Sequence, residues 1–378
     1  MLNRRMFVQS AIAGVGGTRA LGRGYRAAII GHTGRGNYGH EWDRAWSGFP
    51  SIEVVAVADP DDAGRRTARA RSGALREYRD WRQMLQSEKP DLVAICPRWP
   101  EQRVEMVSAA AEAGAHMVVE KPFARTLEEA DRMVQVAEGH KVKIQVGHPA
   151  RPDPVTLQVR EMLRQGAIGQ LMELRARGKE DRRAGGEDLM VLGTHCFDLM
   201  RFFAGDPEWV FADVTAAGRA VDRSLAREGT EPVGPIAGDQ VAAMFAFPGG
   251  VRGYFGSKAS DAPDNGRFGV TLFGSKGAIF IPLTGVPGDP AMLLRTPSWA
   301  EGAWQRLELP PEARVRTRDA ANARMVADLL EAIEKDRDPI CSARDGRWTI
   351  EMATGVYQSH LAGAKARFPL RDRRHPLA

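Results

Sequence analysis

The tripeptide Glu120-Lys121-Pro122 holds the first side chain with clear chemical potential, because it follows an apolar run that extends from His116 to Glu120. If that run is a strand of a parallel sheet, Lys121 lies beyond its carboxyl end, where ligands of open α/β sheets bind. An ammonium there can hydrogen-bond a substrate hydroxyl, and its pKa falls toward the range useful for proton transfer when it is desolvated. We therefore predict that Lys121 is catalytic; a surface lysine before a kinking proline is the alternative.

A glycine-rich run, Gly31-His32-Thr33-Gly34-Arg35-Gly36-Asn37-Tyr38-Gly39, follows the apolar run Arg26 to Ile30. Glycine is needed where the backbone turns sharply and approaches a pyrophosphate, whose charge is met by the N-terminus of the next helix. We prefer the frame that starts at Gly31, directly at the strand end, although Thr33 then replaces the usual second glycine. The frame Gly34, Gly36, Gly39 fits the motif fully but begins three residues later.

Asp59 ends the next apolar run, Ile52 to Ala58, and lies 28 residues past Gly31 (59 − 31 = 28). An acid roughly 20 residues after the first glycine usually holds a ribose 2′-hydroxyl, and an insertion between Tyr38 and Pro50 would explain the longer spacing. A carboxylate there repels a 2′-phosphate, so NAD is favoured over NADP. The alternative is that Asp59-Pro60-Asp61-Asp62 forms only a turn and a helix cap.

His195 and Asp198 form a second group of candidates, three residues apart within Gly193-Thr194-His195-Cys196-Phe197-Asp198. On a helix this spacing places both side chains on one face. The imidazole could bind or deprotonate a hydroxyl while Asp198 orients it. A histidine beside an aspartate on a helix is more often structural.

The elements that must position these residues alternate between apolar runs and helical patterns up to Val146, which is the signature of βαβ units and a parallel sheet. Thr126-Leu127-Glu128-Glu129 has the form of a capping box that opens a helix to about Glu138. The predicted strands are Arg26 to Ile30, Ile52 to Ala58, Leu92 to Cys96, His116 to Glu120 and Lys143 to Val146.

After Gly147 the pattern favours an α+β domain with a large, mostly antiparallel sheet, because Pro248-Gly249-Gly250 and Gly274-Ser275-Lys276-Gly277 read as hairpin turns. The predicted strands are Leu171 to Arg177, Trp209 to Thr215, Gln240 to Phe247, Val251 to Gly256, Val270 to Phe273 and Ala278 to Ile281. The predicted helices are Val155 to Gln165, Glu187 to about Phe203, Ala320 to Glu334 and Trp348 to Leu361. An open sheet of this kind commonly pairs with a copy of itself, so we expect a homo-oligomer.

Composition narrows the classes of partner. The net charge of +5 is spread along 378 residues, without the dense basic cluster of a nucleic-acid or membrane surface. No apolar run reaches the roughly 18 residues of a membrane span. The three cysteines, Cys96, Cys196 and Cys341, match neither a metal site nor a disulfide framework, and we expect them to be buried and structural.

The first 24 residues differ from the rest. Asn3-Arg4-Arg5-Met6-Phe7-Val8-Gln9, followed by small apolar residues to Gly17, resembles a twin-arginine export signal. We therefore expect a periplasmic or otherwise exported protein; the alternative is a frayed N-terminus on a cytoplasmic one.

Together these motifs resemble the glucose–fructose oxidoreductase and inositol dehydrogenase family, also called Gfo/Idh/MocA. Further matches are Gln145-Val146-Gly147-His148, Gly166-Ala167-Ile168-Gly169, Gly185-Gly186 and Tyr357-Gln358-Ser359. The resemblance implies a Rossmann dinucleotide-binding domain over residues 25–148, doubly wound around its parallel sheet, and a substrate-binding and oligomerisation domain over 149–378. It also implies that Cys96, Pro97, Glu120 and Lys121 lie beside the cofactor.

Two departures from the family pattern are visible. Val191 stands where the family usually has an aspartate, four residues before His195, and Asp188 could replace it only if the helix start bends. Cys96-Pro97-Arg98-Trp99-Pro100 stands where a Thr-Pro turn and histidines are common. Arg151 and Lys179 follow strands of the two domains and are further candidates for contacting the substrate.

The predicted reaction is reversible hydride transfer between NAD and a secondary hydroxyl of a sugar, polyol or sugar derivative. Lys121 and His195 would handle the hydroxyl proton. One alternative is a glycosidase or lyase that uses a held NAD for transient oxidation and elimination. Another is a sugar- or nucleotide-binding protein that has lost catalysis.

Overall fold

The computed structural model describes residues 24–260, 267–283, 290–298, 302–309 and 317–378. The proposed export signal thus lies outside the described residues. The chain divides into two compact units. The described part of the first unit comprises residues 24–124, 129–152 and 317–347, and that of the second comprises 125–128, the described residues of 153–310, and 348–378.

In the described residues the first unit contains a six-stranded sheet in the order β3-β2-β1-β4-β5-β6, and every neighbouring pair is parallel. This order is that of the Rossmann fold. The strands are β1 (Tyr25–Ile30), β2 (Ile52–Ala58), β3 (Arg76–Tyr78), β4 (Leu92–Ile95), β5 (His116–Val119) and β6 (Ile144–Val146). The predicted parallel sheet is confirmed, and the short, polar β3 is the strand that the hydrophobic pattern missed.

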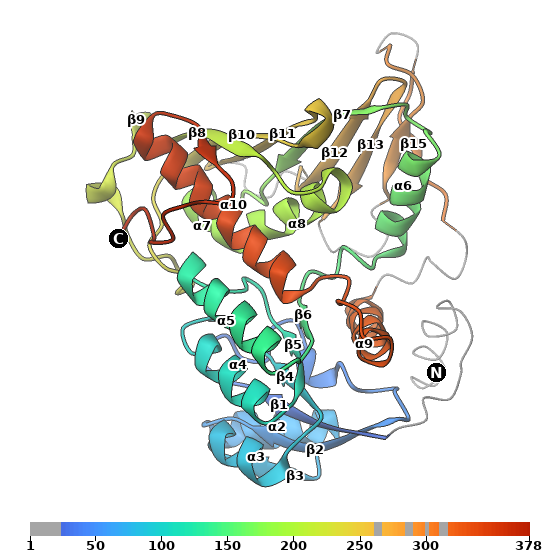
Figure 1. Ribbon diagram of the computed structural model, residues 1–378, viewed down its shortest axis with the longest axis vertical. Helices are drawn as coiled ribbons and strands as arrows, with labels where there is room; N and C mark the ends of the chain where they lie inside the picture. Colours follow the sequence, from blue (N-terminus) through green and yellow to red (C-terminus); the bar gives the residue numbers. More distant parts are fainter. Residues whose placement is uncertain (1–23, 261–266, 284–289, 299–301, 310–316) are drawn as a thin grey trace. The chain divides into compact units, whose positions relative to one another are not determined.

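Helices accompany this sheet, as Figure 1 shows. They are α2 (Asp62–Ser72), α3 (Trp81–Glu88), α4 (Arg103–Glu112), α5 (Leu127–Gly139) and α9 (Arg318–Glu334), together with the start of α10 (Ala343–Ala362). The apolar residues of the central strands are buried, and Ile29, Ile30 and Ile95 have no exposed surface. Burial on both faces is why these strands read as continuous apolar runs.

The prediction of a helix directly after the glycine turn is wrong. The segment forms turns and a short 3-10 helix, η1 (Trp42–Arg44). Asn37, Gly39 and Glu41 all have positive φ, at 53°, 59° and 65°. Left-handed residues at alternate positions cannot continue a right-handed α-helix, so the chain enters the core through Trp42 and Trp46 instead.

In the described residues the second unit contains a ten-stranded sheet in the order β15-β14-β13-β12-β7-β11-β10-β8-β16, with β9 paired to β8. Only the β7 and β11 pair among these neighbours is parallel. Both predicted hairpins are confirmed. The strands are β7 (Leu171–Arg177), β8 (Trp209–Ala216), β9 (Arg219–Ala220), β10 (Gln240–Ala246), β11 (Arg252–Lys258), β12 (Gly269–Gly274), β13 (Gly277–Pro282), β14 (Met292–Leu294), β15 (Gln305–Arg306) and β16 (Ala366–Arg367).

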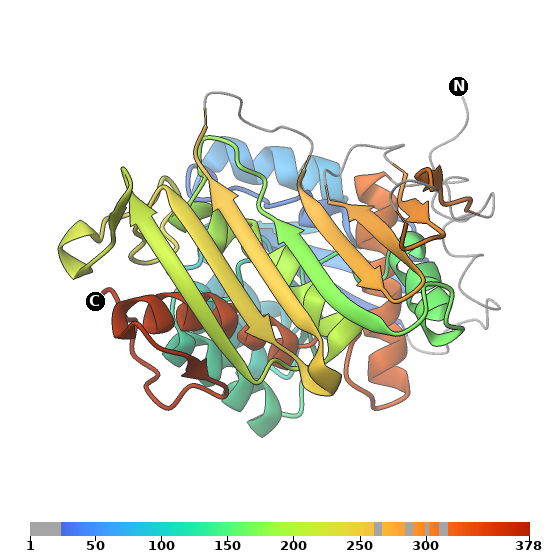
Figure 2. The same cartoon turned by 90° about the horizontal axis from the view of Figure 1, so that it is seen from above.

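Helices α6 (Pro154–Arg164), α7 (Gly186–Val191) and α8 (Gly193–Ala204) contact one face of this sheet. The second unit also has the 3-10 helices η2 (Arg223–Leu225) and η3 (Pro248–Gly250). Figure 2 looks onto the opposite face, where no described helix covers the strands. The sheet therefore has one packed face and one open face.

The single helix predicted from Glu187 to about Phe203 is in fact two, α7 and α8, separated at Leu192. Two contacts account for the break. Gly193 passes so close to Phe255 that a Cβ would lie 3.1 Å from its ring. The Thr194 hydroxyl donates to the Val191 carbonyl at 3.3 Å, a local bond that bends helices.

The boundaries of the units also differ from the predicted ones. We expected everything after residue 148 to form the second domain, yet α9 belongs to the first unit and contacts β5 and β6. The Gln145 amide donates to the Met325 carbonyl at 3.3 Å, which ties this helix to β6. A helix so distant in sequence cannot be assigned to either unit from periodicity alone.

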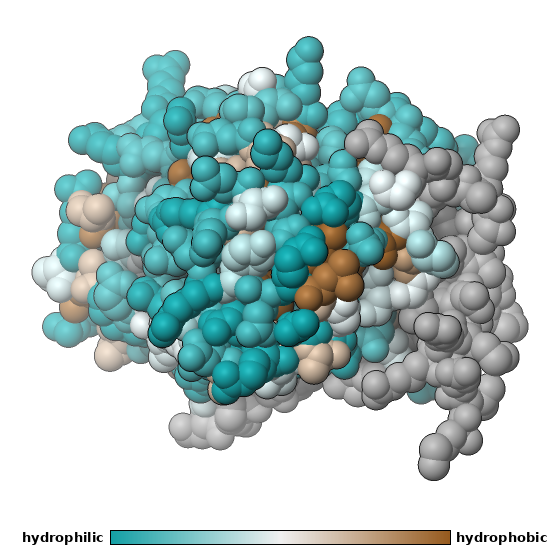
Figure 3. Space-filling model, turned by 90° about the horizontal axis from the view of Figure 1, so that it is seen from below, coloured by the Kyte–Doolittle hydropathy of each residue, from teal (hydrophilic) through white to brown (hydrophobic). Residues whose placement is uncertain are grey.

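No helix in the described ranges combines the length and the apolar character needed to cross a bilayer. The side drawn in Figure 3 is covered mainly by hydrophilic residues, with a small apolar area.

Candidate functional site

The carboxyl edge of the parallel sheet brings together most of the candidates of the first unit. Because β1, β2, β4, β5 and β6 all run in the same direction, the residues that follow them share this edge. They are Gly31, Asp59, Cys96, Glu120 and Gly147, each directly after its strand. The sequence-based placement of Lys121 at this edge is therefore confirmed.

The glycine turn is fastened to Asp59. The Thr33 N–H donates to both carboxylate oxygens of Asp59, at 3.2 and 3.0 Å, and the Thr33 hydroxyl donates to Oδ2 at 2.8 Å. The Asp61 N–H donates to Oδ1 at 2.9 Å. Asp59 has no exposed surface. The expected contact with a ribose hydroxyl does not fit this conformation, because the carboxylate holds the turn itself.

The individual glycines of the turn have different tasks. A Cβ on Gly31 would overlap the ring of Tyr38, so this glycine makes room for an aromatic side chain. A Cβ on Gly36 would lie 2.5 Å from the Arg98 N–H nitrogen, so this glycine lets the turn pack on the loop after β4. Gly34 has a φ of 84°, is exposed and has open space where a Cβ would lie, while its N–H donates to Asn37 Oδ1 at 2.9 Å. Gly34 is thus the point where a ligand can approach the backbone.

The loop after β4 can offer backbone groups to a ligand, but not the thiol of Cys96. Cys96 is completely buried, and burial raises the pKa of its thiol well above the usual range. Cys196 and Cys341 are buried free thiols as well, as expected for structural cysteines. The predicted contact of Cys96 with a cofactor cannot involve its side chain in this conformation.

Glu120 is a fully buried carboxylate with several donors. The His40 N–H donates to Oε1 at 2.8 Å, the His40 ring nitrogen Nδ1 contacts the same oxygen, and the Lys121 N–H donates to Oε2 at 2.6 Å. Burial alone would raise the pKa of Glu120, but the His40 ring, the Lys121 ammonium and the Lys121 N–H lower it to about 2. Lys121 itself is only 3% exposed.

Arg103, at the start of α4, binds the loop after β4 and the segment after Lys121. Its guanidinium is buried and donates to the carbonyl of Pro122 and to that of Pro97. Burial lowers the pKa of Arg103 to about 10, while the charge of Glu120 opposes this shift. Sequence reasoning found neither His40 nor Arg103, because an arginine inside a helix and a histidine after a turn carry no distinguishing pattern.

Arg151, predicted to contact the substrate, is engaged inside the first unit. Its guanidinium donates to the Ile340 carbonyl at 2.9 Å and forms an ion pair with Asp345 at 3.1 Å. The side chain is 7% exposed. Arg151 therefore holds the segment before α10, and its contact with a substrate stays a prediction.

In the second unit His195 lies on α8 and is partly exposed, whereas Asp198 is completely buried. A substrate can thus reach His195 but not Asp198 in this conformation. Val191, the last residue of α7, is completely buried, and as a valine it provides no carboxylate at the position where the family resemblance implies one.

Asp188 does not replace that carboxylate. Its Oδ2 accepts from the Ser257 hydroxyl at 2.6 Å and from the Glu180 N–H at 3.1 Å, and its Oδ1 accepts from the Lys179 N–H at 3.3 Å. Burial raises the pKa of Asp188 although these donors oppose the shift. The carboxylate holds the loop after β7, and this loop presents Lys179, whose side chain is 32% exposed.

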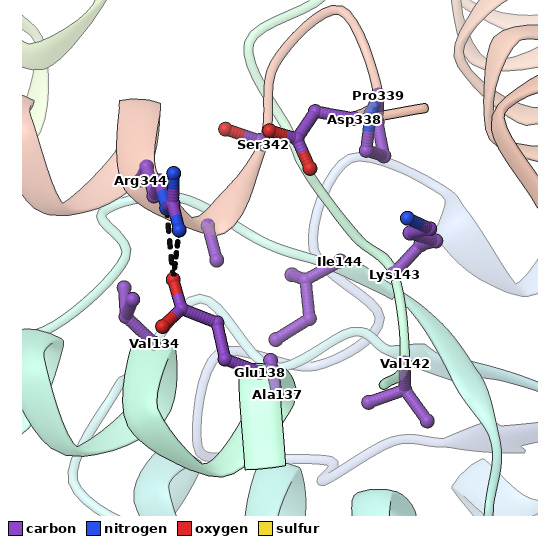
Figure 4. A pocket seen from close by; sticks show the side chains of 11 residues that line it. Val134, Ala137, Glu138, Val142, Lys143, Ile144, Asp338, Pro339, Ser342 and Arg344 are labelled. Atoms are coloured by element: carbon purple, nitrogen blue, oxygen red, sulfur yellow. Dashed lines mark hydrogen bonds and ion pairs between the residues drawn. The ribbon is translucent and has the colours of Figure 1, made fainter. Parts of the chain in front are cut away.

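A groove elsewhere in the first unit is not part of this edge. Figure 4 shows its apolar floor, which includes Val142 and Ile144, and its charged rim, where Arg344 pairs with Glu138 at 2.7 Å. Ile144 is the first residue of β6. The groove therefore lies at the amino end of that strand, away from Lys121.

The carboxyl edge suits a pyrophosphate-containing dinucleotide. Gly34 offers an exposed, left-handed backbone, and His32, Arg35 and Arg98 are basic residues of the same turn and of the loop after β4 that packs on it. Arg35 is held by Glu101, with Nε 3.0 Å from Oε1. These donors match the charge of a diphosphate, although the α-helix that usually faces it is absent from the described segment after the turn.

Two family models match consecutive parts of this chain. A model described as oxidoreductase family, NAD-binding Rossmann fold, matches residues 25–148, and a model described as GFO/IDH/MocA C-terminal domain matches residues 156–280. The chain belongs to the GFO/IDH/MocA oxidoreductase family. NAD is the cofactor of this family's Rossmann domain and hence of the first unit.

Several similar proteins are dehydrogenases by name. The D-apiose dehydrogenase of Paraburkholderia graminis is 33% identical over 207 residues, which are 52% of this chain and 54% of the relative. The levoglucosan dehydrogenase of Pseudarthrobacter phenanthrenivorans is 26% identical over 256 residues, 61% and 65% of the two chains. The chain thus spans between 54% and 65% of these curated relatives.

Solved structures support the fold over most of the chain. A levoglucosan dehydrogenase in complex with NADH and levoglucosan has a TM-score of 0.76 and 19% identity, and the match covers 92% of this chain and all of that one. The WlbA dehydrogenase from Bordetella pertussis, in complex with NADH and UDP-GlcNAcA, has a TM-score of 0.69 and 22% identity over 92% of this chain and 99% of that one. At this identity the likeness establishes the fold alone.

Proposed function

We propose that this protein is an NAD-dependent oxidoreductase that transfers a hydride between nicotinamide and a secondary hydroxyl of a sugar, polyol or sugar derivative. The observation that carries the proposal is the buried lysine of Glu120-Lys121-Pro122 at the carboxyl edge of a Rossmann sheet. The names of the relatives, which include an apiose and a levoglucosan dehydrogenase, favour a sugar-like alcohol.

Each of the proposed groups has a limited task. When bound, the nicotinamide supplies the hydride acceptor or donor. Gly34, Arg35 and Arg98 hold the diphosphate. Lys121 Nζ takes the hydroxyl proton as the neutral amine when the alcohol is oxidised, and returns it as the ammonium in the reverse direction, while His195 hydrogen-bonds the substrate. Lys121 is the stronger candidate for the base, because no carboxylate accompanies His195 at position 191.

A Lys121→Ala variant tests this proposal, with exposed Lys335→Ala as the control. Turnover of a sugar panel with NAD, followed by NADH absorbance, should fall at least ~10²-fold in Lys121→Ala, because a proton-transfer group is lost. NAD affinity and folding should remain. Unchanged turnover would remove Lys121 from the mechanism. Release of an aglycone without net NADH would instead favour a glycosidase or lyase that acts by transient oxidation and elimination. Retained binding of sugar or nucleotide without any turnover would favour a non-catalytic binding protein.

We also propose that the open face of the second sheet pairs with a second copy of this chain. A row of cross-strand neighbours, Phe211, Met244, Tyr254 and Arg175, crosses this face. Phe211 and Tyr254 are 43% and 37% exposed, which is unusual for large apolar side chains. Acidic Glu173 and Asp213 lie on the same face as basic Arg175. A surface with acidic and basic side chains around an apolar row can contact the same surface of a second copy across a two-fold axis.

Finally, we propose export by the twin-arginine route, on the basis of Arg4-Arg5 and the small apolar residues that follow. Expression of the full chain and of an Arg4→Lys/Arg5→Lys variant in a bacterium with this pathway tests the proposal by cell fractionation. The natural chain should reach the periplasm and the variant should stay in the cytoplasm. An equal distribution of both would refute export by this route.

A further inference from the structure

The peptide that carries Lys121 is held on both sides by side chains from distant parts of the first unit. On the amino side, Glu120 is bound by His40, which follows the glycine turn. On the carboxyl side, the carbonyl of Pro122 accepts from Arg103 on α4. Both neighbours of the lysine are thus fixed by groups that sequence patterns did not single out.

The Glu120 carboxylate has almost no room to turn. A Cβ on Gly39 would lie 2.5 Å from its Oε1, and a Cβ on Gly147 would lie 3.4 Å from its Oε2. Both oxygens are engaged as well, Oε1 by His40 and Oε2 by the Lys121 N–H. A completely buried charge with these contacts keeps one orientation, and the backbone of Lys121 is bonded directly to it.

Arg103 joins the tripeptide to the loop after β4. Arg103 is 1% exposed, and its guanidinium binds two carbonyls, those of Pro97 and Pro122, so that its planar fork spans two loops. The loop after β4 in turn packs on Gly36, where the Arg98 N–H donates to the Gly36 carbonyl at 3.3 Å. One side chain therefore links the position of Lys121 to that of the glycine turn.

We propose that Arg103 and His40 are positioning residues for Lys121, and that they set the place of its ammonium relative to the dinucleotide turn without contacting the substrate. The inference rests on the proposed function, because it presumes that Lys121 transfers the proton. Misplacement of a reacting group by about 1 Å can cost ~10²-fold in rate. A lysine has a long, flexible side chain, so a fixed backbone is the chief means of limiting where its Nζ can be.

The test is a double-mutant cycle with Arg103→Lys and His40→Gln, each made in the natural chain and in Lys121→Ala. The controls are exposed Arg82→Lys on α3 and His140→Gln after α5. We expect Arg103→Lys and His40→Gln to lower kcat by ~10-fold or more, with KM and NADH affinity within ~3-fold, because the loss concerns the transition state. In the Lys121→Ala background the same substitutions should lower the residual kcat by less than ~2-fold.

A merely structural role would give a different result, since both substitutions would then lower activity equally in both backgrounds. Such additivity, or an unchanged kcat in both variants, would overturn the proposal. If Arg103→Lys does not fold, His40→Gln alone decides, because His40 is at the surface and its ring is 36% exposed. A Lys121→Ala variant with full activity would refute the proposed function itself, which separates the two failures.

Discussion

At the scale of single residues, Glu120 is a completely buried carboxylate whose two oxygens both accept hydrogen bonds. Its pKa lies at about 2, below the ordinary value of 4.5, because the His40 and Lys121 contacts outweigh the effect of burial. A lowered pKa means that the ionised carboxylate stabilises the folded state by roughly 3 kcal/mol above about pH 4.5, and that this contribution is lost as the pH falls through 2.

We therefore predict that Glu120→Gln is less stable than the natural chain at neutral pH, and that the difference shrinks between about pH 4.5 and pH 2. Urea unfolding, followed by the fluorescence of buried Trp42 and Trp46, measures this in the first unit. Exposed Glu53→Gln is the control and should change little at either pH. A difference that stays constant with pH would contradict the assigned contacts.

The sequence identified some of these residues and not others, for physical reasons. Lys121 could be placed because a strand end in a parallel sheet fixes where the next side chain lies. Asp59 was assigned to a ribose by spacing, yet Thr33 in the second glycine position supplies a hydroxyl and an N–H that bind it. Spacing in a motif cannot reveal such a local partner.

At the scale of elements, the long strands were predictable, whereas the short strands β3, β9, β14, β15 and β16 and the helix break were not. The predicted limits of β2 and β7 match the structure, because their hydrophobic patterns end at polar turns or loops. The break between α7 and α8 depends on the close approach of Phe255 to Gly193, a contact between residues far apart in sequence. The left-handed residues after the glycine turn likewise depend on where Trp42 and Trp46 are buried.

The loop after β7 gives a prediction at this scale. In Asp188→Ala the Ser257 hydroxyl and the N–H groups of Lys179 and Glu180 lose their acceptor, and an unsatisfied buried donor costs about 1–3 kcal/mol. We expect a lower melting temperature for this variant. We also expect a raised KM for the sugar with unchanged NADH affinity, because the loop presents Lys179.

Exposed Asp372→Ala is the matched control and should change neither quantity. Differential scanning calorimetry and steady-state kinetics provide the two measurements. A variant with a natural melting temperature and a natural KM would show that Asp188 does not hold this loop.

At the scale of the whole molecule, the open face of the second sheet predicts self-association. Light scattering coupled to gel filtration should give a mass well above the 41.4 kDa of one chain. A Phe211→Glu/Tyr254→Glu variant should return to the mass of one chain, because like charges would meet across a two-fold contact. The control is Leu157→Glu, at a 42% exposed position on α6. A natural chain that is monomeric would contradict the proposed interface.

The most direct test of the central claim is the binding of NADH to the carboxyl edge of the first unit. Fluorescence titration should show saturable binding to the natural chain, and Gly34→Asp should weaken it at least ~10-fold relative to Gly34→Asn. Asp and Asn are nearly the same size and strain the left-handed backbone at this open position alike, and only the aspartate repels a diphosphate. Absence of binding, or equal affinity of the two variants, would contradict a dinucleotide site at this turn.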